Sequence, residues 1–112
     1  MTIYAFGDVI LVPFPFTDQS TTKQRPAVVI SSAGYHGARP DLILMAITRQ
    51  VRTSLVFGER LITDWQPAGL IRPSILKPLV TTIERALVIK RLGKLSTRDQ
   101  SDLRVLIATI LG

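Results

Sequence analysis

Short apolar runs, each bounded by proline, glycine or polar residues, divide the first two-thirds of the chain. Residues 9–12, 27–30 and 42–47 are continuously apolar, which is typical of buried strands. Pro13 is expected to end the first run because proline cannot donate to a central ladder. The remaining strand candidates are residues 54–57, 60–62, 74–77 and 80–83. The segment from Gly34 to Pro40 is turn-like, so the pattern predicts a mainly β domain, a small barrel or sandwich of short strands.

The period of the pattern changes over the last sixteen residues. Ser96 is a good helix N-cap, and Asp99 three residues later makes an acidic variant of the capping box. We predict a helix over about 97–111, which is too short to be stable alone and must pack on the β portion or on a partner. Apolar residues spaced as one helix face follow: Leu103, Leu106, Ile107, Ile110 and Leu111.

Length and composition favour one folded domain spanning residues 1–112. The 46% hydrophobic content argues against disorder, and the absence of cysteine excludes a disulfide scaffold and thiol-ligated metal sites. No apolar run approaches the roughly 20 residues that span a bilayer, and the N-terminal residues lack the pattern of a secretory signal. We therefore expect a cytoplasmic protein without a membrane segment.

The chemistry available to this chain is narrow. A net charge of +6 favours a polyanionic partner. His36 is the only histidine, which excludes a two-histidine mechanism within one chain, and its turn-like surroundings favour a solvated loop residue. No metal-ligand motif, phosphate-binding loop or paired carboxylates are visible, so we expect neither metal nor cofactor. An enzyme would have to use Arg, Lys, Ser and Thr, which suits RNA because its 2′-OH is a built-in nucleophile and fixed guanidiniums can stabilise the phosphate.

Five motifs, in this order along the chain, make the interpretation as an RNA-cleaving enzyme more specific. The sequence GDVILVPFPFTD at residues 7–18 is followed by KQRPAVVIS at 23–31 and AITRQ at 46–50. The last two are DWQPAGLIRPS at 64–74 and RLGKLS at 91–96. Together they resemble the PemK/MazF family of toxin endoribonucleases, in its PemK-like branch, over nearly the whole chain. Arg49 departs from the Ile-Thr-Ser-Gln element of the family, where a serine stands.

The resemblance implies an SH3-like small barrel with a C-terminal helix, a homodimer that cuts single-stranded RNA and is silenced by a cognate antitoxin. Arg25, before Pro26, matches the catalytic arginine of the family, and Thr48 matches its catalytic threonine. Because arginine does not deprotonate in proteins, we assign Arg25 to stabilising the phosphorane rather than to removing a proton. Thr48 would then hydrogen-bond a nonbridging oxygen. The antitoxin is expected to place an acidic tail in the Arg25 groove.

A second set of residues is predicted to bind RNA around this pair. The polar segment 17–24 could close over the strand, with Phe16 stacking on a base. Arg49 and Arg52 flank the site from the Thr48 side and suit phosphate. The predicted RNA-binding residues are Phe16, Thr17, Ser20, Thr21, Lys23, Arg49, Gln50, Arg52 and Lys77.

Other features have plainer interpretations. Trp65 is expected to be a packing anchor. A basic stretch without an intervening acid is typical of a solvated face; its members are Arg85, Lys90, Arg91, Lys94 and Arg98.

Two other functions remain open at this stage. A protein-binding toxin on the same fold, in the manner of the gyrase poison CcdB, would capture a topoisomerase instead of cutting RNA. A catalytically silent RNA-binding barrel is the other, because Arg49 departs from the family pattern.

Overall fold

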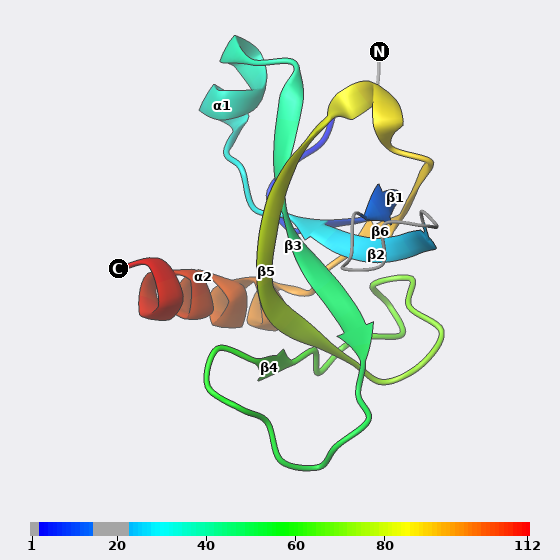
Figure 1. Ribbon diagram of the computed structural model, residues 1–112, viewed down its shortest axis with the longest axis vertical. Helices are drawn as coiled ribbons and strands as arrows, with labels where there is room; N and C mark the ends of the chain where they lie inside the picture. Colours follow the sequence, from blue (N-terminus) through cyan, green and yellow to red (C-terminus); the bar gives the residue numbers. More distant parts are fainter. Residues whose placement is uncertain (1–2, 15–22) are drawn as a thin grey trace.

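The computed structural model of the protein describes residues 3–14 and 23–112. Within them, one antiparallel sheet has the strand order β4-β5-β3-β2-β1-β6 (Figure 1). The strands are β1 (Asp8–Phe14), β2 (Lys23–Val29), β3 (Asp41–Arg49), β4 (Arg60–Leu61), β5 (Ser74–Glu84) and β6 (Lys90–Lys94). The helices are α1 (Ala33–Ala38), the 3₁₀ turn η1 (Arg85–Leu87) and α2 (Thr97–Leu111).

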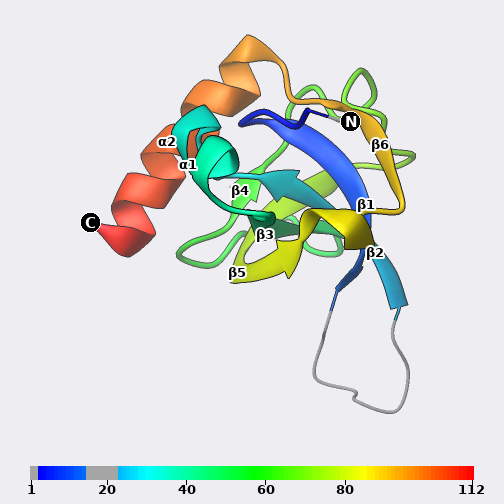
Figure 2. The same cartoon turned by 90° about the horizontal axis from the view of Figure 1, so that it is seen from above.

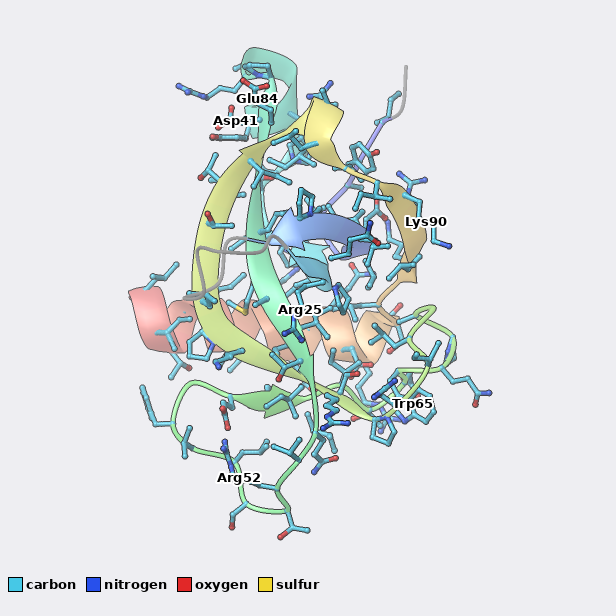
Figure 3. All side chains as sticks on the ribbon, turned by 45° about the vertical axis from the view of Figure 1, so that its right-hand side comes forward. Arg25, Asp41, Arg52, Trp65, Glu84 and Lys90 are labelled. Carbon is cyan, nitrogen blue, oxygen red and sulfur yellow. The ribbon has the colours of Figure 1, made fainter. Side chains whose placement is uncertain are left out.

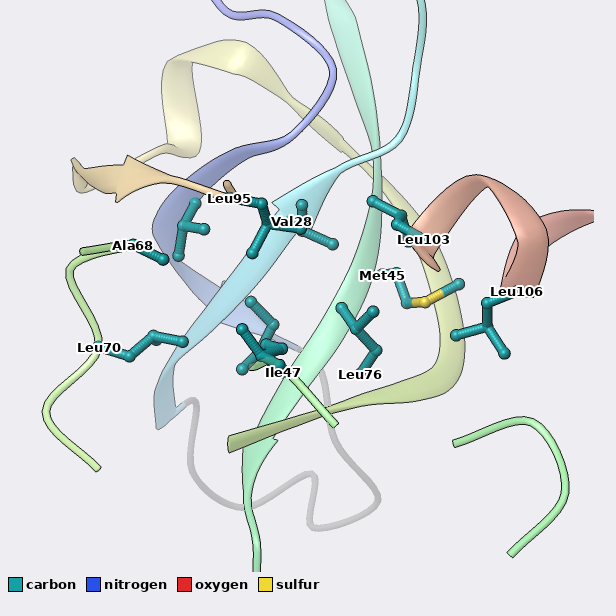
Figure 4. Packing of buried hydrophobic residues seen from close by; sticks show 11 residues of the cluster. Val28, Met45, Ile47, Ala68, Leu70, Leu76, Leu95, Leu103 and Leu106 are labelled. Atoms are coloured by element: carbon teal, nitrogen blue, oxygen red, sulfur yellow. The ribbon is translucent and has the colours of Figure 1, made fainter. Parts of the chain in front are cut away.

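Both faces of the central strands are buried, which explains why their sequences are continuously apolar rather than alternating. One face of β3 contributes Met45 and Ile47 to a core beneath α2, where Leu103 and Leu106 point toward the sheet (Figure 4). The opposite face contributes Leu42, Leu44 and Ala46 to a second core on the other side of the sheet. The sheet curves strongly, and α2 lies along its outside (Figure 2).

The predicted C-terminal helix is confirmed, with the same bounds. Ser96 caps it as expected, since its side-chain oxygen accepts from the amide of Asp99. The carboxylate of Asp99 does not act within a capping box, however. It is buried and accepts from the backbone amides of Thr63 and Asp64, at 3.0 and 2.8 Å. This carboxylate ties the segment after β4 to the first turn of α2.

Replacing Asp99 with alanine is expected to lower the free energy of unfolding by about 2–4 kcal/mol, because two backbone amides lose the buried carboxylate that accepts their hydrogen bonds. Urea denaturation measures the loss. Asp102→Ala on the same helix is the matched control, since Asp102 only pairs with Arg60 at a partly exposed position and should cost less than about 1 kcal/mol. Equal losses in the two variants would contradict the assigned role of Asp99.

The prolines explain two differences from the predicted strands. β1 continues past Pro13 to Phe14, because β6 pairs only with Asp8–Leu11 and leaves the end of β1 bonded on one side. The predicted strands 74–77 and 80–83 are one strand, β5, and Pro78 lies where the β3–β5 register shifts. A register shift tolerates the missing amide of proline.

Three further differences concern local structure. Residues 54–57 were predicted as a strand but lie in an exposed loop between β3 and β4. Strand β6 was not predicted, since only Leu92 among its side chains is apolar and the strand has no buried residue. Most of the turn-like segment 34–40 belongs to α1, a helix without a buried residue, so no apolar periodicity marked it.

Polar contacts hold α1 against the sheet, and His36 is one of them rather than a solvated loop residue. Its Nδ1 donates to the carbonyl of Tyr4 at 3.0 Å, so its Nε2 accepts from the hydroxyl of buried Ser31. At the end of α1, Asp41 accepts from the Tyr35 hydroxyl at 2.7 Å and from Arg39 at 3.1 Å. The single histidine therefore has a structural role.

The hydrogen bond from Tyr35, together with Arg39, holds the pKa of Asp41 below its ordinary value. A carboxyl with a lowered folded pKa stabilises the protein at pH values above its unfolded pKa of about 4, and the contribution is lost as pH falls through the folded value. We therefore expect the urea midpoint to fall on acidification below about pH 4. Asp41→Asn should flatten this acid dependence, and an unchanged slope in that variant would contradict the assignment.

Most of the basic stretch from Arg85 to Arg98 is engaged in the fold. Arg85 donates to the carbonyl of His36, Arg91 and Lys94 pair with buried Asp8, and Arg98 pairs with Asp64. Four of its five cations thus bind partners within the protein, which goes beyond the predicted solvated face. Trp65 packs against the core beneath α2, as expected.

Candidate functional site

A cavity of about 570 Å³ opens where β2 and β3 separate. The two strands pair from Val29–Leu44 to Ala27–Ala46, and the pairing stops at the Ala27–Ala46 pair. Arg25 and Thr48 lie just past this point, on β2 and β3 respectively, and both line the cavity. Proline at position 26 offers no amide to a neighbouring strand, which fits an end of pairing at this place.

Loops and β5 complete the walls of the cavity. The amide of Gln50 donates to the carbonyl of Pro73 at 2.9 Å, which joins the end of β3 to the segment before β5. The hydroxyl of buried Ser74 donates to the carbonyl of Arg72 at 2.9 Å. The described residues that line it are Gln24, Arg25, Pro26, Ile47, Thr48, Arg49, Gln50, Val51, Arg52, Leu55, Glu59, Leu70, Ile71, Arg72, Ser74, Ile75 and Lys77.

The charge of the lining is strongly positive. One carboxylate, Glu59, faces five cations among the described residues: Arg25, Arg49, Arg52, Arg72 and Lys77. Such a concave cluster focuses positive potential and favours an anion. Among the described residues, no group of three or more potential metal ligands gathers anywhere. The cavity therefore suits a ligand that carries phosphate or carboxylate groups.

The cavity brings together six of the residues predicted to act on RNA: Arg25, Thr48, Arg49, Gln50, Arg52 and Lys77. Figure 3 shows Arg25 and Arg52 toward one end of the sheet, with Asp41 and Glu84 at the opposite end. Phe16, Thr17, Ser20 and Thr21 lie outside the described residues. Lys23 begins β2, paired with Phe14 of β1.

Two of these side chains also make local hydrogen bonds. The hydroxyl of half-buried Thr48 donates to the carbonyl of Arg49 over a long 3.4 Å. Such a weak contact leaves the hydroxyl able to turn toward a ligand at little cost. The side-chain amide of Gln50 donates to the carbonyl of Arg52 at 3.0 Å, so Gln50 also shapes the loop that follows β3.

The sequence pattern did not single out Glu59, Arg72 or Ser74 as site residues. Glu59 accepts two hydrogen bonds from Nη2 of Arg52, at 2.9 and 3.1 Å, and its side chain is only 7% exposed. The amide of Val56 donates to the same carboxylate at 3.0 Å. The Val56 amide first, then Arg52 and Lys77, hold the pKa of Glu59 below its ordinary value. Arg52 and Glu59 are seven residues apart in a segment without helix or strand, so only the loop conformation reveals the pair.

Comparison with known proteins decides the family. Residues 5–111 match the family of PemK-like, MazF-like toxins of type II toxin–antitoxin systems. The chain belongs to this family. No curated protein sequence gives a significant match. The family match over residues 5–111 confirms the resemblance that the five motifs indicate.

Solved structures share the fold of this PemK/MazF-like protein. A mycobacterial endoribonuclease, solved with its cognate antitoxin, has a TM-score of 0.78 at 14% identity, covering 98% of this chain and 96% of its own. The Mycobacterium tuberculosis toxin MazF-mt6 has a TM-score of 0.71 at 18% identity, covering 90% and 92%. A chain of the MazE–MazF structure from Deinococcus radiodurans has a TM-score of 0.68 at 21% identity, covering 96% of this chain and 94% of its own.

These likenesses confirm a mainly β, MazF-like fold with a C-terminal helix. In residues 3–14 and 23–112, no helix is long and apolar enough to cross a membrane.

Proposed function

We propose that this protein is an endoribonuclease toxin that cuts single-stranded RNA in the cavity lined by Arg25 and Thr48, without a metal ion. The observation that carries the proposal is that these two residues, matched to the catalytic pair of the family, line one cavity together with Arg49, Arg52 and Lys77. Family membership and a fold shared with known endoribonucleases support it.

The reaction requires little beyond positioning and charge stabilisation. The ribose 2′-oxygen forms a bond to phosphorus as the bond from phosphorus to the 5′-oxygen breaks, leaving a 2′,3′-cyclic phosphate and a 5′-OH. The 2′-hydroxyl gives up its proton to solvent, and the departing 5′-oxygen takes up a proton from solvent while Arg25 donates a hydrogen bond to it. Arg25 retains its charge throughout, so its main contribution is to neutralise the phosphorane. Thr48 donates a hydrogen bond to a nonbridging oxygen.

The same cavity is the proposed contact for an antitoxin. A cavity to which the described residues contribute five cations and one carboxylate suits an acidic segment that folds on binding and excludes RNA. The mycobacterial and Deinococcus neighbours were each solved with an antitoxin. We further propose a homodimer, as the family resemblance implies.

RNA cleavage in the presence of EDTA tests this function. Purified protein is incubated with a single-stranded RNA oligonucleotide pool, and a pool of the same sequences made of DNA serves as the control. Cleavage of RNA alone, with 5′-OH product ends, is expected because the 2′-hydroxyl is the nucleophile. Cleavage of the DNA pool would contradict attack by the 2′-oxygen.

The two other functions give different results in the same assay. A gyrase-binding toxin would leave RNA intact and inhibit supercoiling by gyrase. A silent RNA-binding protein would retain RNA tightly and release it uncut after long incubation.

A further inference from the structure

The loop between β3 and β4 supplies Arg52 to the cavity, yet apolar burial does little to hold it. Every residue from Val51 to Phe57 is exposed. Arg52 itself has a side chain that is 53% exposed. A long arginine on such a loop would ordinarily sample many rotamers, and ordering it on a ligand would cost entropy.

Hydrogen bonds to one carboxylate organise this loop instead. Oε1 of Glu59 accepts from the amide of Val56 at 3.0 Å and from Nη2 of Arg52 at 2.9 Å, while Oε2 accepts from the same Nη2 at 3.1 Å. The amide of Glu59 in turn donates to the carbonyl of Val56 at 3.1 Å. Glu59 thus closes the turn and fixes the end of Arg52 with the same side chain.

The surroundings of Glu59 distinguish three roles: a general base, a competitor with RNA for Arg52, and a positioning residue. A general base needs a pKa near neutrality, and the lowered pKa of Glu59 makes it a weak one. A carboxylate that merely competed with RNA for Arg52 would not need to organise the backbone of the turn. The hydrogen bond from the Val56 amide, together with the near-complete burial of the side chain, favours a positioning role.

We propose that Glu59 is a positioning residue that holds Arg52 ready to bind a substrate phosphate in the cavity. The inference rests on the proposed RNA cleavage and names one further residue on which substrate binding depends. Within the part of the chain that the structure describes, Arg52 uses Nη2 for Glu59 and Nε for the carbonyl of Ser54, which leaves the donors of Nη1 for a phosphate oxygen. Preorganisation of this kind improves binding because the ordering cost is met before the ligand arrives.

The negative charge of Glu59 makes the test decisive. A positioning role and a purely electrostatic role predict opposite changes in KM when this charge is removed. Glu59→Gln removes one negative charge beside the site, so charge alone would lower KM for RNA. Positioning predicts that KM rises roughly tenfold, the size expected for one charge-assisted hydrogen bond, with kcat little changed. Glu84→Gln is the matched control, since it makes the same charge change at the opposite end of the sheet (Figure 3). It should leave KM unchanged.

A salt titration and a double mutant supply measurements that would not change if Glu59 only stabilised the fold. Loss of one phosphate contact should reduce the slope of log KM against log salt by about 0.7 in Glu59→Gln and in Arg52→Ala. In the Arg52→Ala background, Glu59→Gln should not raise KM further, because its effect passes through Arg52. Thermal unfolding confirms that each variant is folded, and Glu59→Asp, which retains the charge, serves if the glutamine variant does not fold.

The outcomes distinguish this inference from the function on which it rests. If wild type leaves RNA intact, the proposed function fails and this role of Glu59 fails with it. If wild type cuts RNA and Glu59→Gln shows an unchanged or lower KM, the function stands and the positioning role is overturned. Additive increases in the double mutant would also overturn it, since Glu59 would then act independently of Arg52.

Discussion

Replacing Arg25 with alanine is expected to lower kcat for RNA cleavage by roughly 10²- to 10³-fold, the loss typical of removing one preorganised donor to a developing oxyanion. Arg25 is half-buried on β2 where its pairing with β3 ends, and a guanidinium in this position neutralises charge that grows on the phosphorane. Because the gain is made in the transition state, kcat should fall more than KM rises. Single-turnover cleavage measured at saturating protein isolates this step.

Two further variants make the prediction about Arg25 specific. Arg25→Lys retains the charge but loses the planar fork, so its rate should lie between those of wild type and Arg25→Ala. Arg98→Ala removes an exposed cation that pairs with Asp64 away from the cavity, and it should cut RNA at the wild-type rate. If Arg25→Ala cuts as fast as Arg98→Ala, the assignment of the site is wrong.

Replacing Gly69 with alanine is expected to destabilise the protein by about 3 kcal/mol or more. Gly69 has φ of +88°, a region that costs an L-residue about 1–2 kcal/mol. A Cβ at this position would lie 2.1 Å from the carbonyl oxygen of Leu92, and a Cβ on Gly93 would lie 2.4 Å from that of Ala68. Two backbone segments therefore cross here with no room for a side chain on either.

Thermal unfolding measures this effect. A loss of this size should lower Tm by roughly 10 °C or more in a domain of this length. Gly37→Ala is the control, because nothing lies within 4 Å of its added Cβ and alanine favours the α1 helix. Equal Tm values for the two variants would contradict the crossing. Since Leu70 and Arg72 line the cavity, Gly69→Ala should also impair cleavage.

Sequence reasoning succeeded where one local pattern determines the structure. The apolar spacing from Leu103 to Leu111 and the serine at position 96 were enough to predict α2 with its bounds. Arg25 before Pro26 and Thr48 at the end of an apolar strand were recognisable from motif alone, and the structure brings them to one cavity.

The features that could not be predicted depend on contacts between distant or irregular segments. Gly69 and Gly93 belong to two motifs whose crossing is visible only in the fold. The Arg52–Glu59 pair needs a turn that no periodicity marks. Pro78 reads as a strand end in sequence, yet a register shift against β3 lets β5 continue through it. The α1 helix buries no residue, so hydrophobic patterning could not reveal it.

The central claim is that RNA is cleaved in the cavity around Arg25, by attack of the RNA's own 2′-hydroxyl on the adjacent phosphate. Mapping the product ends from a mixed pool of single-stranded RNA, cut in EDTA by wild type and by Arg25→Ala, tests it most directly. The account predicts 5′-OH and 2′,3′-cyclic phosphate ends from wild type and almost none from Arg25→Ala. Intact RNA with wild type, or the same ends at the same rate from Arg25→Ala, would contradict it.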